Sequence, residues 1–70
     1  MNGLILRSIS ENLPLEVIYI SEKQELSHRK LIIKEINGST VRAYCLLRRQ
    51  IRTFRLENIL SIMPEKQPFH

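Results

Sequence analysis

The sequence predicts a mainly β protein, in which one N-terminal helix precedes a five-stranded, strongly bent antiparallel sheet that curls into a small barrel. Three observations predict this fold class. Helical spacing of apolar residues occurs only before Pro14, several short segments after it alternate between apolar and polar residues, and Asn37-Gly38 stands between two of these segments as a hairpin signal. Strong bending toward closure is an economical way for so few strands to protect their edges.

The chain has 70 residues, enough for one small domain, which we expect to span residues 1–64 with a flexible tail at 65–70. Its 43% hydrophobic and 26% charged residues are ordinary for a folded domain and argue against disorder. The apolar run at residues 1–6 is too short for a signal peptide or a membrane span. We therefore expect a cytoplasmic protein, and self-association would help so small a chain to bury its surface.

The first element is expected to be a helix over residues 4–13, because its apolar residues recur at helical spacing. Asn2 is placed to cap this helix, and Pro14 ends it. A short strand over residues 4–9 is the alternative, since the segment is brief and rich in isoleucine. The strands that follow are expected at residues 15–21, 26–36, 41–47, 51–56 and 60–63.

The loop between the second and third predicted strands decides their register. A two-residue loop would bring Lys34 to the core side of the sheet. A three-residue loop over residues 37–39 pairs Ile33 with Ala43 instead, so that apolar side chains meet. This register also sets Lys34 opposite Arg42, a like-charge pair that a bound anion would relieve.

The third and fourth predicted strands form a second hairpin with basic residues on one face. If residues 49–50 make a two-residue loop, Cys45 lies opposite Phe54 on the inner face. Tyr44 then lies opposite Arg55 on the outer face. A single cysteine makes no internal disulfide, so Cys45 is expected to be a small buried hydrophobe.

The basic charge of the chain suggests an anionic partner, since the formal net charge is +4. Five arginines gather within this second hairpin: Arg42, Arg48, Arg49, Arg52 and Arg55. Guanidinium groups suit phosphate, and an exposed aromatic ring such as that of Tyr44 offers a base a face to stack on. The alternative is that Tyr44 packs against arginine stems and the charges form a solvated face.

Three motifs together resemble the WYL domain, an Sm-like barrel of bacterial regulators. They are Ser27-His28-Arg29, Ala43-Tyr44-Cys45 and Arg52-Thr53-Phe54-Arg55-Leu56, within a resemblance that spans residues 15–62. The chain departs from the family at Ser39-Thr40-Val41, where the Trp-Tyr-Leu triplet should stand and only the aliphatic third position is kept.

The resemblance implies a small Sm-like barrel that senses a ligand in transcription regulation, with basic residues engaging single-stranded nucleic acid or a nucleotide. Together with Arg42, which the strand pattern sets beside Tyr44, this gives the expected ligand-binding or nucleic-acid-binding residues: Arg29, Arg42, Tyr44, Arg48, Arg52 and Arg55. The alternative function is structural, a homo-oligomer or a complex with a regulatory protein partner formed through an exposed sheet edge, with no small ligand.

An enzyme is not expected. Ser27 and His28 are neighbours on a predicted strand and point to opposite faces, so they cannot act together as nucleophile and base. The carboxylates are scattered, and the spacing of His28, His70 and Cys45 does not resemble a metal site. No cofactor, no membrane partner and no helix for reading duplex DNA are expected.

Overall fold

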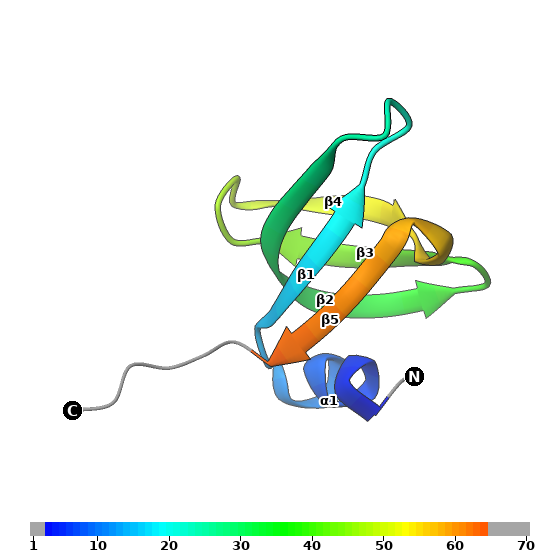
Figure 1. Ribbon diagram of the computed structural model, residues 1–70. Helices are drawn as coiled ribbons and strands as arrows, with labels where there is room; N and C mark the ends of the chain where they lie inside the picture. The colour runs from blue at the N-terminus through cyan, green and yellow to red at the C-terminus, as the bar shows by residue number, and fades with distance from the viewer. Residues whose placement is uncertain (1–2, 65–70) are drawn as a thin grey trace.

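The computed structural model describes residues 3–64 as one helix and a five-stranded antiparallel sheet (Figure 1). The order of strands across the sheet is β4-β3-β2-β1-β5. The elements are α1 (Gly3–Glu11), β1 (Leu15–Ile20), β2 (Leu26–Asn37), β3 (Thr40–Cys45), β4 (Gln50–Arg55), the 3-10 turn η1 (Leu56–Asn58) and β5 (Ile59–Pro64). The mainly β prediction is confirmed. The predicted tail at 65–70 and the predicted cap Asn2 lie outside the described residues.

Helix α1 ends earlier than the sequence pattern predicted. Asn12 takes a left-handed conformation, with φ of 53°, and the backbone N–H of Leu13 donates to the carbonyl of Ser8 over 3.3 Å. This arrangement closes the last turn and satisfies a carbonyl that the helix leaves unpaired. The helix therefore stops at Glu11, ahead of Pro14, and the alternative strand over residues 4–9 is excluded.

The buried hydroxyl of Ser8 fixes the helix to the sheet. It donates to the carbonyl of Leu13 over 2.7 Å and accepts the backbone N–H of Ile33 on β2 over 2.8 Å. Ser8 is fully buried and is the single buried polar residue within the described part of the chain. Buried polar groups need partners, and here one hydroxyl satisfies two backbone groups at once.

The pairing of β2 with β3 confirms the predicted partner of Ile33 but not the predicted loop. Ile33 does face Ala43, as expected. A bulge at Lys34 shifts the register, so Glu35 faces Arg42, and Nη1 of Arg42 lies 3.2 Å from Oε2 of Glu35. The loop is two residues long, with Gly38 at φ of 63°. The predicted like-charge pair of Lys34 and Arg42 is therefore wrong, because the bulge replaces it with an ion pair.

The pairing of β3 with β4 differs from the prediction by four residues, since Phe54 faces Val41 and not Cys45. Residues 46–49 form a longer turn than expected, and Arg49 takes a positive φ of 57° within it. A shift by an even number of residues keeps every side chain on its predicted face. The inner residues therefore stay buried, whereas Leu47, expected on the inner face, is 83% exposed in the turn.

The sheet bends strongly without closing. Tyr19 of β1 contacts Phe54 of β4, although β2 and β3 lie between these strands in the sheet. The core inside this bend and beneath α1 consists of Ile5, Leu15, Val17, Leu31, Ile33, Val41, Ala43, Cys45 and Phe54. The predicted barrel is not supported, because β1 pairs with β5 on its outer side and leaves β4 and β5 as two separate edges. No helix in residues 3–64 is long and apolar enough to cross a membrane.

Candidate anion-binding site

The register of the sheet separates the predicted binding residues into groups. Arg42, Tyr44 and Arg55 lie on the outer face of the β3-β4 hairpin, because residues opposite one another share a face. Arg52 lies opposite the buried Ala43 and therefore belongs to the other face. The expectation of one arginine-rich outer face is wrong in this respect, since neighbouring strand positions alternate.

The outer face offers less to an anion than the sequence pattern indicated. Arg42 already forms an ion pair with Glu35. Tyr44 is half-buried and lies between Ile32 and Ile51 across the sheet, where it was expected to face Arg55. The aromatic ring is thus flanked by aliphatic side chains, which fits a packing role better than a stacking platform.

A cleft opens where β2 parts from β3. The first half of β2 pairs with β1, and pairing with β3 begins only at Leu31, where β3 ends at Cys45. The chain turns away there, and the backbone N–H of Leu46 donates to the carbonyl of Lys30 over 3.1 Å. The resulting cleft has a volume of about 540 Å³ and is lined by Ser27, His28, Arg29, Lys30, Cys45, Leu46, Leu47 and Arg48.

Two of the predicted binding residues, Arg29 and Arg48, are brought together by this cleft. Arg29 is half-buried on β2, and Arg48 is exposed in the β3-β4 turn. Several arginines have no carboxylate within ion-pair distance among residues 3–64: Arg29, Arg48, Arg49, Arg52 and Arg55. The cleft therefore presents positive charge that its own protein surroundings do not neutralise.

Hydrogen-bond donors converge on Cys45 at the base of the cleft. Burial raises the pKa of the Cys45 thiol, but the backbone N–H groups of Arg48 and Leu47 and the guanidinium of Arg29 outweigh it. The pKa of Cys45 is consequently below its ordinary value. Donors that lower the pKa of this thiol mark a point of positive electrostatic potential in the cleft.

His28 pairs with a carboxylate on the neighbouring strand. Its Nε2 lies 3.0 Å from Oε1 of Glu16 on β1. Ser27 and His28 face Tyr19 and Ile18 respectively, so their side chains leave β2 on opposite faces. Within the range 3–64, no three His, Cys, Asp or Glu side chains are grouped so that they could hold a metal ion.

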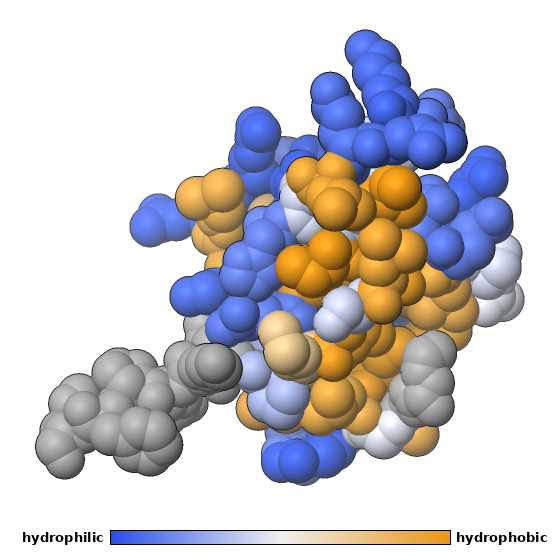
Figure 2. Space-filling model, in the orientation of Figure 1, coloured by the Kyte–Doolittle hydropathy of each residue, from blue (hydrophilic) through white to orange (hydrophobic). Residues whose placement is uncertain are grey.

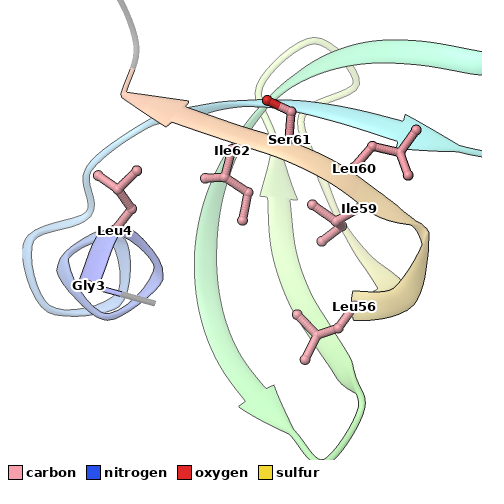
Figure 3. A pocket seen from close by; sticks show the side chains of 7 residues that line it. All are labelled: Gly3, Leu4, Leu56, Ile59, Leu60, Ser61 and Ile62. Atoms are coloured by element: carbon pink, nitrogen blue, oxygen red, sulfur yellow. The ribbon is translucent and has the colours of Figure 1, made fainter. Parts of the chain in front are cut away.

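A second cleft, which the sequence did not reveal, lies between α1 and β5. It has a volume of about 520 Å³ and is lined by Gly3, Leu4, Leu56, Ile59, Leu60, Ser61 and Ile62. Figure 3 shows Leu4 on the helix across from Ile59 and Ile62 on the strand, with Ser61 directed away. The lining carries no charged side chain, so this cleft does not suit an anion. The one available signal was the absence of charge along residues 59–64.

The apolar surface continues beyond this second cleft. Figure 2 shows a band of apolar side chains over β1 and β5, with hydrophilic side chains on either side of it. Leu26, Leu60 and Met63 are exposed by 65%, 55% and 43% respectively. The basic cleft and the apolar band are therefore distinct parts of the surface.

Comparison with solved structures gives a likeness of fold. The fold resembles part of proteasome accessory factor B/C (PafBC) of Arthrobacter aurescens, with a TM-score of 0.73 and 24% sequence identity. The match covers 93% of this chain but only 11% of the PafBC chain, so this chain corresponds to a small part of that protein. PafBC contains a WYL domain, and the likeness is consistent with a WYL-like fold. No protein-family model and no curated protein matches the chain.

Proposed function

We propose that the protein is a ligand-sensing or regulatory binding module that takes an anionic ligand, either single-stranded nucleic acid or a nucleotide, in the cleft between β2 and the β3-β4 turn. The observation that carries this proposal is the meeting of Arg29 and Arg48 in one cleft without a carboxylate partner among the described residues. Planar guanidinium groups bind phosphate through paired, charge-assisted hydrogen bonds.

The likeness of fold to part of PafBC supports a regulatory module in a general way, and the WYL resemblance points to the same kind of ligand. We propose a binding protein and not an enzyme, because Ser27 and His28 of the cleft leave β2 on opposite faces and so do not act together as nucleophile and base.

Salt-dependent binding of a short, fluorescein-labelled single-stranded oligonucleotide tests the proposal. We expect measurable affinity at low salt that falls as salt is added, because phosphate contacts release counterions. Arg29→Gln and Arg48→Gln should each weaken binding about tenfold, the loss expected for one charge-assisted hydrogen-bonding group.

Arg7→Gln provides a matched control, because Arg7 lies on α1 and pairs with Glu11 within the same helix. It removes the same charge without touching the cleft. Equal weakening by Arg7→Gln and by the cleft variants would show a general charge effect, and absence of binding at low salt would remove the proposal.

A second candidate function is supported by the β5 edge. Residues 59–64 carry no charge, and Leu60 and Met63 are exposed on that strand, whereas the opposite edge, β4, carries Arg52 and Arg55. Charged residues protect a strand edge from pairing, so β5 is the less protected edge. A homo-oligomer or a complex with another protein would form there. Light scattering should then give a multimer that Leu60→Lys dissociates and Leu47→Lys, at the exposed turn, does not.

A further inference from the structure

The arginines without a carboxylate partner among residues 3–64 do not form a continuous track. Arg55 lies on the outer face of the β3-β4 hairpin, Arg52 lies on the opposite face, and Arg48 lies in the turn beyond β3. Proteins that bind single strands without sequence preference combine a basic groove that follows the backbone with aromatic stacking platforms. Neither Tyr44, which lies between Ile32 and Ile51, nor the divided arginines provide such a path.

The cleft itself has the size of a small-molecule site. Its volume of about 540 Å³ lies within the usual range of ligand pockets, which is roughly 300–1,000 Å³. The β3-β4 turn bounds it on one side and β2 on the other, and the hydrogen bond from Leu46 to Lys30 marks where the two segments meet. An extended strand leaving this cleft would meet Arg52 on the inner face that Arg29 shares, but Arg55 only on the opposite face.

The walls of the cleft divide into a charged part and an apolar part. Arg29, Lys30 and Arg48 supply positive charge, while Leu46 and Leu47, from the same turn as Arg48, supply aliphatic surface. Leu47 is 83% exposed, the largest exposure among the large apolar side chains of residues 3–64. A ligand with an anionic end and a flat apolar body would cover this leucine while its anion meets the guanidinium groups.

We propose that the cleft binds a small phosphorylated ligand of mononucleotide size, with the phosphate between Arg29 and Arg48 and the base against Leu46 and Leu47. This inference rests on the proposed function and narrows its ligand class. A single strand would bind through one nucleotide at a time, and its length would add no further contact.

A length series tests this inference, with ribonucleoside 5′-monophosphates, dinucleotides and longer single-stranded oligonucleotides as probes. Calorimetry should give dissociation constants, expressed per nucleotide, that agree within about threefold across the series. All of these constants should depend only weakly on salt concentration. The unphosphorylated nucleosides should bind at least about tenfold more weakly, since they lack the group that Arg29 and Arg48 engage.

Two variants separate the outcomes. Leu47→Ser should weaken binding of the monophosphates while the control Ile51→Ser, on the outer face of β4, leaves it unchanged, and thermal melts should show both variants folded. Affinity per nucleotide that climbs about tenfold or more with length, and falls in Arg52→Gln or Arg55→Gln, would overturn the inference and leave the proposed function standing. Failure of every phosphorylated probe to bind would overturn both.

Discussion

Tyr19 on β1 and Phe54 on β4 meet edge to face, with their ring centroids 5.0 Å apart and their planes at 79°. The two strands are not neighbours in the sheet, so this contact exists only because the sheet bends. Aromatic pairs in this geometry gain about 0.5–1.5 kcal/mol beyond their burial. The pair joins β1 and β4 through side chains across the bend, whereas a closed barrel would need a backbone ladder between the edge strands β4 and β5.

Replacing Phe54 with alanine should destabilise the protein severely. Phe54 is 5% exposed, and large-to-small changes of a buried phenylalanine cost about 3–5 kcal/mol. Phe54→Leu, which keeps most of the volume, should lose much less. Urea denaturation followed by circular dichroism gives both values. A loss below about 1 kcal/mol for Phe54→Ala would mean that the aromatic contact does not hold the bend.

Ser8→Ala should weaken the attachment of α1 to the sheet. The change leaves the backbone N–H of Ile33 without its buried partner, and an unsatisfied buried group costs about 1–3 kcal/mol. Ser10→Ala is the matched control, because Ser10 is exposed on the same helix and makes only a long 3.5 Å contact with Arg7. Its free energy of unfolding should stay within about 0.5 kcal/mol of the wild type. Equal effects of the two changes would contradict the anchoring role of Ser8.

Arg29→Gln should raise the pKa of Cys45, because the guanidinium charge is one of the groups that hold it down. Thiolate absorbance against pH reports this directly, since Cys45 is the one cysteine of the chain. A thiol whose pKa is lower in the folded than in the unfolded state stabilises the folded protein at pH values above the unfolded-state pKa. This stabilisation is lost as the pH falls through the folded-state pKa. The advantage of the wild type over Arg29→Gln should therefore grow with rising pH through that window, and an unchanged titration would contradict the contact.

Arg42→Gln should leave ligand affinity within about twofold of the wild type, although the sequence pattern placed Arg42 in the binding site. Its guanidinium pairs with Glu35 on the outer face, away from the cleft. The ion pair is half-exposed, so the loss of stability should also be small. A loss of affinity as large as that of Arg48→Gln would show that the outer face belongs to the binding site.

The sequence was sufficient for the faces of the sheet but not for its registers. Alternation along β3 correctly predicted that Val41, Ala43 and Cys45 point inward. It could not fix the partner of Phe54, because a slip by four residues satisfies the same alternation. The bulge at Lys34 was also missed, because strict alternation was assumed along β2, whereas the extra residue moves the next inner-face position from residue 35 to Ile36.

The sequence predicted individual residues of the cleft but not their arrangement. Arg29 and Arg48 were both named from the sequence, but their meeting depends on where β3 ends and on how far β2 extends beyond it. Both are properties of the register. Leu46 and Leu47 were assigned to the strand, with Leu47 on the inner face and Leu46 on the outer face, so the apolar wall of the cleft was missed. The end of α1 was missed for a local reason, because Asn12 rather than Pro14 stops the helix.

The most direct test is the mapping of backbone amide shifts by NMR during titration with a ribonucleoside 5′-monophosphate. We predict that the largest shifts fall on residues 27–30 and 45–48, which line the cleft, and that Arg48→Gln raises the ligand concentration needed to saturate them about tenfold. Shifts centred on Arg42, Tyr44 and Arg55 would place the ligand on the outer face and contradict the account, as would the absence of any saturable shift.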